Sequence, residues 1–243
     1  MADEADRRIA SRYTDGSYLA RHADWHAADA PWKAAHVLRM LRRHDLHPAR
    51  IADAGCGAGE VLARLQRELP PTTTLTGFDL SPDAIALAAA RSSERLTFRQ
   101  EDVSRWDGEP FDLLLALDVF EHVPDYLGFL SALRAAARRF VFHVPLELSA
   151  KNVLSGGALR RSLDVFGHLH YFTRATALAA LEHAGYAIVD WSYTASGVEL
   201  ASPTLGNRVL KLPRRALFAV APELCVRLLG GYSLLVLAEG DRP

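Results

Sequence analysis

Residues 50–60 read RIADAGCGAGE and hold the clearest structural signal in the chain. A short apolar run leads into a turn that contains Gly55, Gly57 and Gly59, and a run of helix-forming residues follows. Glycine adopts positive φ angles easily and has no Cβ, so the chain can bend sharply there and backbone N–H groups can approach a ligand. The stretch therefore predicts a strand, a turn and a helix that together bind a nucleotide or nucleoside.

Around this turn, apolar runs typical of buried strands alternate with segments of helical periodicity. The predicted strands are residues 50–54, 75–80, 96–100, 111–117 and 140–144, and the predicted helices are 31–44, 60–69, 82–91 and 124–138. Right-handed crossovers between parallel strands place helices on both faces of a sheet, so this order predicts an α/β, doubly wound fold. The later chain predicts a helix at 174–184, strands at 186–194 and 232–238, and mostly helix at 213–229. Residues 146–170 are expected to be irregular with one short helix, and residues 200–212 to form a loop.

Length and composition indicate one globular domain. The chain has 243 residues, 49% of them hydrophobic and 23% charged, with a formal net charge of −1. This balance gives no electrostatic reason to expect binding to nucleic acid or to an anionic membrane. No apolar run reaches the roughly 18 residues of a membrane-spanning helix. Cys56 and Cys225 lie far apart, and no signal peptide is recognised, so we expect a cytoplasmic protein with free thiols, acting on a small molecule as a monomer or homodimer.

Four acidic residues fall at or near the ends of predicted strands: Asp53, Asp79, Asp102 and Asp118. In open α/β sheets, ligands bind at the carboxyl ends of the strands beside the topological switch point. Asp79 follows the second strand, where a carboxylate can accept hydrogen bonds from both hydroxyls of a ribose. The G-x-G-x-G spacing of the turn is one residue shorter than the dinucleotide pattern, which favours a nucleoside that carries an amino acid tail.

Four segments in a fixed order carry a resemblance to a known family: IADAGCGAGE, FDLSPDAIALA, FRQEDV and FDLLLALDVFEHVPD. They resemble the class I S-adenosylmethionine-dependent methyltransferases, particularly the small-molecule branch that includes quinone-biosynthesis and sugar methyltransferases. The likeness covers about residues 51–145, with weaker similarity in GHLHYFT and LEHAGY downstream. It implies a Rossmann-like, seven-stranded sheet, mostly parallel, with an antiparallel last strand at 232–238. It also implies S-adenosylmethionine as cofactor and S-adenosylhomocysteine as product.

The resemblance implies cofactor-binding roles for residues in all four segments. These residues are Asp53, Gly55, Cys56, Gly57, Gly59, Asp79, Leu80, Asp102, Val103, Leu117, Asp118 and His122. The glycine turn would lie under the methionine part of the cofactor, and Asp79 would hold the ribose. Leu80, Asp102 and Val103 would contact the adenine, whereas Leu117 and Asp118 would flank the methionine tail and the methyl group.

Three histidines are candidates for catalysis: His143 at the end of the fifth strand, and His168 and His170 in GHLHYFT. Methyl transfer from a sulfonium needs alignment, exclusion of water and, for a hydroxyl acceptor, removal of a proton. Histidine suits proton removal because its pKa lies near working pH. His168 fits the methyltransferase pattern best. The alternative is structural: His143 as a hydrogen-bonded core residue, and His168 or His170 as an anchor of its loop.

The remaining predictions concern metals, domains and the N-terminus. No short ligand motif such as H-E-x-x-H or C-x-x-C is present, so no metal is expected. Residues 1–45 are predicted to form a helical cap over the cofactor site, and 46–243 the methyltransferase domain with substrate-shaping insertions at about 146–172 and 196–230. In the cap, Tyr18 or Trp25 is predicted to contact the methionine end or the substrate; ordinary packing against the sheet is the alternative.

The sequence thus predicts methyl transfer to an oxygen of a sugar, quinone or secondary metabolite. Two alternatives remain open at this stage. One is a regulatory or binding protein that keeps the cofactor pocket without turnover. The other is a nicotinamide-dependent oxidoreductase, which the glycine spacing and the EDV and DVFEHV segments disfavour.

Overall fold

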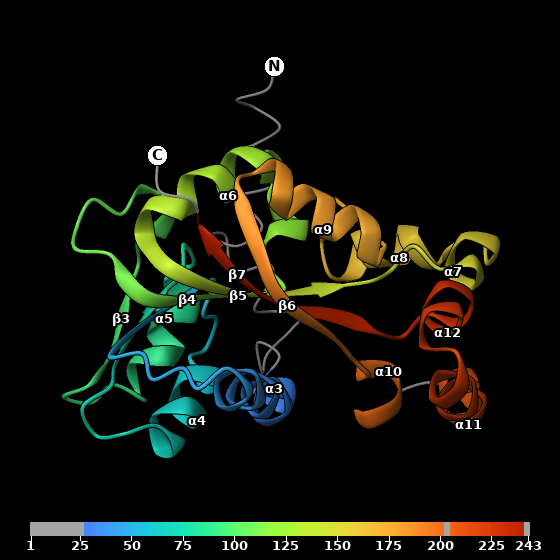
Figure 1. Cartoon of the computed structure of the whole chain (residues 1–243), viewed down its shortest axis with the longest axis horizontal. Coiled ribbons are helices and arrows are strands. Elements are labelled where there is room, and N and C mark those ends of the chain that lie inside the picture. The colour runs from blue at the N-terminus through green and yellow to red at the C-terminus, as the bar shows by residue number, and fades with distance from the viewer. Residues whose placement is uncertain (1–26, 202–204, 241–243) are drawn as a thin grey trace.

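The computed structural model describes residues 27–201 and 205–240, and a seven-stranded sheet crosses its centre (Figure 1). The strands are β1 (Arg50–Ala54), β2 (Thr74–Phe78), β3 (Leu96–Arg99), β4 (Phe111–Leu117), β5 (Ala137–Pro145), β6 (Tyr186–Thr194) and β7 (Ser233–Gly240). Their order is β3-β2-β1-β4-β5-β7-β6, and only β7 runs antiparallel to its neighbours, β5 and β6. The predicted Rossmann-like sheet with an antiparallel last strand is confirmed.

Helices cover both faces of this sheet. On one face lie α3 (Ala30–Arg43) and α4 (Glu60–Glu68), and on the other lie α6 (Tyr126–Leu133) and α9 (Arg174–His183) (Figure 1). Helix α5 (Pro82–Ala89) connects β2 to β3. Short 3-10 turns are η1 (Ala27–Asp29), η2 (Val103–Arg105), η3 (Phe120–His122) and η4 (Arg134–Ala136). The predicted helices of this region therefore exist with boundaries shifted by a few residues.

The central strand β4 explains why its sequence, FDLLLAL, is almost entirely apolar. Successive side chains of a strand point to opposite faces. Leu114 and Ala116 belong to the apolar cluster under α6 and α9, whereas Leu113 and Leu115 belong to the cluster under α3 and α4. Because both faces are covered, the central positions of both sets are apolar, and Asp112 at the start of the strand accepts from the amides of Ala49 and Arg50.

Three segments differ from the prediction. The helix predicted to reach residue 138 ends at Leu133 and is followed by η4, so β5 begins at Ala137 instead of residue 140. Residues 146–170 contain two helices, α7 (Ala150–Leu154) and α8 (Ala158–Val165). The hydroxyl of Ser149 accepts a hydrogen bond from the amide of Asn152 and caps α7, a local signal that outweighs the weak periodicity of this stretch.

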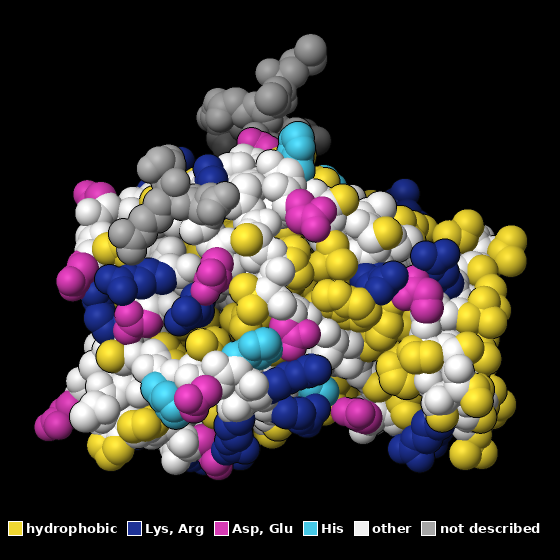
Figure 2. Space-filling view, in the orientation of Figure 1, with side chains coloured by type: hydrophobic (Ala, Val, Ile, Leu, Met, Phe, Trp, Pro, Cys, Tyr) yellow, Lys and Arg dark blue, Asp and Glu magenta, His cyan; other side chains and the backbone are white. Residues whose placement is uncertain are grey.

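The stretch predicted as a loop at 200–212 is largely helical. Helix α10 (Ser196–Glu199) precedes it, and α11 (Leu205–Val220) contains Pro213 in its interior, where a proline normally marks a helix boundary. Helix α12 (Pro222–Leu229) follows. Exposed apolar side chains gather over α7, α11 and α12, at the right of Figure 2: Val153, Leu154, Val209, Leu212, Val220, Leu224 and Leu228. Within the described ranges, no helix has both the length and the apolar character needed to cross a bilayer.

Candidate active site

A cavity of about 970 Å³ lies at the carboxyl ends of the central strands, where the strand order reverses between β1 and β4. Such switch points are the usual ligand sites of open α/β sheets. The volume is at the upper end of the roughly 300–1,000 Å³ of small-molecule pockets. Thirteen of the predicted site residues line it: Asp53, Gly55, Cys56, Gly57, Asp79, Leu80, Asp102, Val103, Leu117, Asp118, His122, His143 and His168.

The glycine turn forms one wall of the cavity and leaves no room for a side chain at Gly55 or Gly59. Gly55 has a φ of +67°, and a Cβ at this position would lie 2.9 Å from Cγ2 of Val119. Gly59 has a φ of +79° and does not line the cavity. A Cβ there would lie 2.5 Å from the ring of Phe98, so this glycine lets α4 pack closely on β3. Gly55 therefore shapes the site, and Gly59 shapes the fold around it.

Asp79 links the glycine turn to the end of β2. Its Oδ2 accepts a hydrogen bond from the amide of Gly57 at 2.9 Å, and its Oδ1 accepts one from the amide of Ser81, also at 2.9 Å. Burial raises the pKa of this carboxyl, and the backbone hydrogen bonds oppose that effect. Each carboxylate oxygen has a further lone pair. A ligand hydroxyl in the cavity can donate to it.

A buried charge network joins α3 to the end of β4. Asp118 has a φ of +60°, and its Oδ2 lies 2.6 Å from Nζ of Lys33 while its Oδ1 lies 2.6 Å from Nδ1 of His143. Burial by itself raises the pKa of Asp118, but His143 and Lys33 outweigh it and hold that pKa well below its usual value. Asp118 is consequently a carboxylate with both oxygens occupied by cationic or hydrogen-bonding partners.

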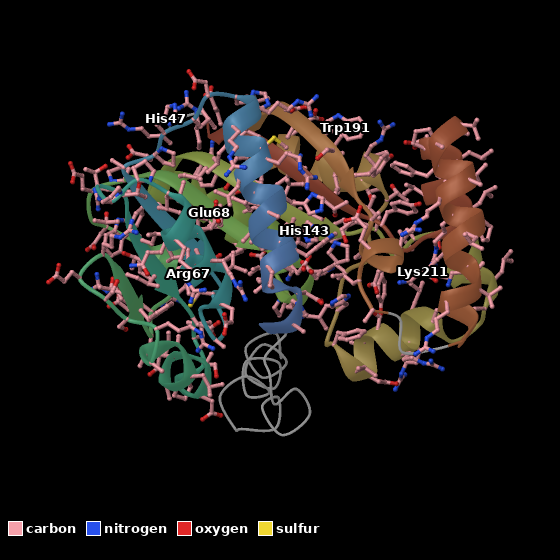
Figure 3. The ribbon with its side chains drawn as sticks, turned by 90° about the horizontal axis from the view of Figure 1, so that it is seen from below. His47, Arg67, Glu68, His143, Trp191 and Lys211 are labelled. Carbon is pink, nitrogen blue, oxygen red and sulfur yellow. The ribbon has the colours of Figure 1, made fainter. Side chains whose placement is uncertain are left out.

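His143 lies beside α3 at the centre of the molecule (Figure 3) and is buried. Its Nδ1 contacts Asp118, and its Nε2 lies 2.8 Å from Oγ1 of Thr194 on β6. Both ring nitrogens thus have protein partners, as expected of a hydrogen-bonded core histidine. A catalytic role for His143 stays a prediction.

The other end of the cavity contains His168, which follows α8. Its Nδ1 lies 2.8 Å from Oε2 of Glu147, and the hydroxyl of Ser162 donates to the other oxygen of the same carboxylate. The ring of Phe166, which also lines the cavity, lies 5.6 Å from the ring of His168. A carboxylate on Nδ1 fixes the proton there and leaves Nε2 of the neutral ring as an acceptor.

Next to His168 lie Glu121 and His122 of η3. Nδ1 of His122 is 3.3 Å from the carbonyl oxygen of Gly167, and the rings of His122 and His168 are 4.8 Å apart. Glu121 is fully buried, and burial, followed by the charge of Asp118, raises the pKa of its carboxyl well above the usual range. Neither carboxylate oxygen has a hydrogen-bond partner among the described residues. The sequence predicts no metal because it contains no short ligand motif. In the folded chain, Glu121, His122 and His168 nevertheless lie close together.

Two predicted residues lie elsewhere. His170 does not line the cavity; its Nε2 is 3.0 Å from the carbonyl oxygen of Val123, and its ring packs 4.6 Å from that of Tyr126. This is the position expected of the loop anchor considered as the alternative. Tyr18 and Trp25 lie outside the described residues, so their predicted contacts are not addressed by the structure.

Sequence reasoning placed the helix at 31–44 in the cap but named none of its residues as part of the site. Lys33 and Trp32 line the cavity, and Nε1 of Trp32 donates to Oε2 of Glu199 at 2.5 Å. A lysine in the first turn of an amphipathic helix looks like an ordinary solvated residue, and no local motif distinguishes it. Burial lowers the pKa of Lys33, but Asp118, Glu121 and Asp29 together outweigh burial and raise it, so the side chain is a cation inside the cavity.

The fold and site define a class: an α/β enzyme that binds a nucleoside at the switch point of a Rossmann-like sheet ending in an antiparallel strand. Residues 25–190 match the family described as a methyltransferase domain, and the chain belongs to this family. It is an S-adenosylmethionine-dependent methyltransferase of the small-molecule type, as the resemblance predicted. The nicotinamide-dependent alternative receives no support.

Individual relatives agree with the family. Trans-aconitate 2-methyltransferase of Streptomyces avermitilis is 38% identical over 124 residues, which cover 49% of this chain and 44% of that protein. Ubiquinone biosynthesis O-methyltransferase of Xylella fastidiosa is 29% identical over 208 residues, which cover 76% of this chain and 83% of that protein. The chain therefore spans less than half of the first relative and most of the second.

Solved structures share the fold at low sequence identity. Magnesium protoporphyrin IX methyltransferase from Synechocystis PCC 6803, crystallised with S-adenosylhomocysteine, superposes with a TM-score of 0.58 at 17% identity, covering 86% of this chain and 83% of that one. A putative methyltransferase of Haloferax volcanii, solved in complex with the Trm112 activator, gives a TM-score of 0.63 at 16% identity, with 96% and 98% coverage.

Proposed function

We propose that this methyltransferase transfers the methyl group to an oxygen of a small molecule with an apolar or aromatic part. The observation that carries the proposal is the pairing of His168 with Glu147 beside Phe166 at one end of the cavity. An oriented imidazole next to an apolar ring suits a hydroxyl acceptor, because the hydroxyl must lose its proton and a flat or apolar body needs a surface to pack on. The name of the ubiquinone biosynthesis O-methyltransferase relative supports oxygen as the acceptor atom.

The opposite end of the cavity is proposed to bind the nucleoside of the cofactor. Asp79 would accept from the ribose hydroxyls with the lone pairs that Gly57 and Ser81 leave unused. Oδ1 of Asp102 accepts from the amide and hydroxyl of Ser104, and Oδ2 lies 3.5 Å from Nε of the exposed Arg105. Oδ2 is the oxygen proposed to accept from the adenine amino group as well. Leu80, which lines the cavity and is half-exposed, would cover one face of the adenine. Val103 would donate its backbone N–H to the ring.

Lys33 and Asp118 are proposed to hold the amino acid tail. The tail of S-adenosylmethionine carries a carboxylate and an ammonium group, and it needs one partner of each sign. Lys33 and Asp118 form an ion pair on the cavity wall beside the glycine turn. A bound tail can replace this ion pair with two contacts, one from its carboxylate to Lys33 and one from its ammonium group to Asp118. Gly55, Cys56 and Gly57 provide the close backbone surface, and Leu117 flanks the tail.

When bound, the cofactor supplies an electrophilic methyl group on a sulfonium. The chain aligns the acceptor oxygen in line with that methyl group, excludes water and receives the hydroxyl proton at the His168 end of the cavity. The acceptor oxygen would form its new bond to that methyl carbon, and the electron pair of the broken S–C bond would stay on sulfur.

The domain organisation also remains a proposal. Trp32 and Lys33 of α3 line the cavity, which supports residues 1–45 as a cap over the cofactor site. Residues Phe166, His168, Ser196 and Leu200 also line it, which supports substrate-shaping insertions at about 146–172 and 196–230. We propose a cytoplasmic enzyme, in keeping with two buried free cysteines, that works as a monomer or homodimer.

The test combines binding and product analysis. Calorimetry with S-adenosylmethionine, S-adenosylhomocysteine and NAD should give binding for the first two only. Mass spectrometry with panels of phenols, catechols, sugars, carboxylic acids and amines should show the gain of one methyl group on oxygen. His168→Asn should lower turnover and leave cofactor affinity unchanged, with the exposed His47→Asn as the matched control. A product methylated on nitrogen or carbon would contradict the proposal.

A further inference from the structure

A chain of polar side chains from four elements ends at the cavity wall: Thr194 on β6, His143 on β5, Asp118 after β4 and Lys33 on α3. Oγ1 of Thr194 lies 2.8 Å from Nε2 of His143, and Nδ1 of the same ring lies 2.6 Å from Oδ1 of Asp118. We propose that His143 and Thr194 are positioning residues that hold Asp118 ready for the ammonium group of the cofactor tail. The inference rests on the proposed function, in which Asp118 and Lys33 hold that tail.

His143 contacts Asp118 through its main chain as well as its ring. The carbonyl oxygen of His143 accepts a hydrogen bond from the amide of Asp118 at 2.9 Å. One residue of the neighbouring strand therefore holds both the backbone and the carboxylate of Asp118. Because the ring engages Oδ1, it is Oδ2 that contacts Lys33 and that is proposed to bind the tail.

The backbone of Asp118 is an independent sign that its position matters. In the part of the chain that the structure describes, positive φ angles outside glycine occur at Asp45, with +50°, and at Asp118, with +60°. Asp45 is an exposed residue just beyond α3, whereas Asp118 lines the cavity. An unfavourable backbone conformation persists only where the surrounding structure enforces it, and such residues cluster at ligand sites. The two contacts from His143 supply that constraint.

The proton on the ring can be assigned from its partners. Burial raises the pKa of Asp118, but His143 and Lys33 outweigh burial and hold that pKa well below its usual value. The ionised carboxylate can only accept, so Nδ1 of His143 carries a proton. Nε2 of a neutral ring then accepts a hydrogen bond, and the hydroxyl of Thr194 is its donor. Thr194 thereby favours the tautomer that donates to Asp118.

The sheet fixes the ring before any ligand binds. Strand β7 lies between β5 and β6, and His143 pairs with Leu235 of β7. Thr194, on the strand beyond β7, is fully buried. On the side of α3, the ring of Trp32 packs edge-on at 5.8 Å from the ring of His143. These contacts give Asp118 a preorganised support, as a binding site requires.

The position of the ion pair argues for a role in binding. Removing charged groups from water costs free energy that an ion pair repays only in part, so apolar residues would serve a purely structural core as well or better. The side chains of Asp118 and Lys33 are 25% and 17% exposed, and both line the cavity, so a ligand can reach them. His143 also lines the cavity, but it is buried and both of its ring nitrogens are engaged. It therefore acts on the tail through Asp118.

The experiment compares two ligands on the full chain by calorimetry, without acceptor. S-adenosylhomocysteine carries the amino acid tail, and 5′-methylthioadenosine has the same nucleoside thioether without it. His143→Leu should weaken binding of the first about tenfold and change binding of the second by less than about twofold. His143→Asn, whose amide can donate to Asp118, should recover most of the loss. Thr194→Val should show a smaller loss for the first ligand alone, and Thr194→Ser should bind like the parent chain. His44→Asn, which removes a 2.7 Å contact with Asp190 outside the cavity, is the matched control and should bind both ligands normally.

Asp118→Asn tests the tail site itself and should also weaken S-adenosylhomocysteine alone. If it does so while His143→Leu binds like the parent chain, the positioning role is wrong and the proposed tail site stands. If Asp118→Asn leaves the ratio of the two affinities unchanged, the proposed tail site fails. Equal losses for both ligands in His143→Leu would show a purely structural role and overturn the inference. Thermal unfolding identifies variants that fail to fold, and Thr194→Val, which nearly preserves side-chain volume, then provides the measurement. Because no acceptor is present, the result does not depend on which atom is methylated.

Discussion

The two ends of the cavity are built in different ways. At the cofactor end, the key contacts join short loops that follow β1 and β2, as when Asp79 accepts from the amides of Gly57 and Ser81. At the acceptor end, side chains from distant segments meet, as when His168 of the α8–α9 segment meets Glu147 and Glu121. A ligand shared by a whole family can be bound by backbone geometry, whereas a particular acceptor needs side chains that differ between members.

This comparison predicts that the two ends can be altered separately. Changes at the cofactor end should reduce cofactor affinity and leave the acceptor end intact. Changes at the acceptor end should alter turnover or acceptor KM while cofactor affinity stays constant. The following changes test that separation.

The largest effect is expected for Asp79→Ala. A pair of ribose hydroxyls would lose its charged acceptor, and the amides of Gly57 and Ser81 would lose theirs. We expect a loss of about 1.5–3 kcal/mol in cofactor binding free energy, measured by calorimetry. Acceptor KM at saturating cofactor should not change. Unchanged cofactor affinity would show that Asp79 does not hold the ribose.

A second effect concerns the pH dependence of stability at the cofactor end. Asp53 is buried, and burial raises its pKa to about 8. In the unfolded chain the pKa of this carboxyl is about 4. At pH values between that pKa and the folded pKa of about 8, the folded chain keeps a proton on Asp53 that the unfolded chain releases. The stability contributed by protonated Asp53 is therefore present below pH about 4 and is lost as the pH rises toward 8, by up to about 1.4 kcal/mol per pH unit.

Asp53→Asn should lack this slope. The free energy of unfolding, measured in urea without cofactor from pH 4 to 9, should fall with pH more steeply in the parent chain than in the variant. Above pH 8 the difference between the two should become constant. Parallel curves over the whole range would mean that Asp53 titrates alike in the folded and unfolded chains and is not held protonated by burial.

The contrast between the ends also explains what the sequence could predict. The glycine turn, Asp79 and the strand β4 each carry their signal within a few neighbouring residues. The structure has the turn and β4 at the predicted positions, and Asp79 lines the cavity, while its contact with a ribose stays a prediction. Boundaries such as the start of β5 shifted because a 3-10 turn, η4, replaces the end of the predicted helix. Local rules are sufficient where the structure is local.

Long-range contacts had no such signal. The contact of Lys33 with Asp118 depends on where α3 packs on the sheet, and the burial of Glu121 depends on the segment after α8, whose amides at Leu169 and His170 donate to its carbonyl. Neither can be deduced from spacing, because the partner residues lie on elements whose relative placement only the folded chain defines. For the same reason, spacing alone does not show that His168 lines the cavity whereas His170, two positions later, does not.

The smallest effect is expected for Phe166→Ala at the acceptor end. The ring lines the cavity beside His168 and is 38% exposed, so an acceptor would cover part of it. Because only part of the ring becomes buried by the acceptor, its removal should cost about 1 kcal/mol of acceptor binding, less than the roughly 1.5–3 kcal/mol for burying a whole side chain. This corresponds to a rise of about fivefold in acceptor KM, measured by steady-state kinetics, with kcat and cofactor affinity unchanged. Leu154→Ala, at an exposed position on α7 outside the cavity, is the matched control. A fall in cofactor affinity in Phe166→Ala would mean that the two ends are coupled through the cavity, and that the separation drawn from their construction does not extend to binding.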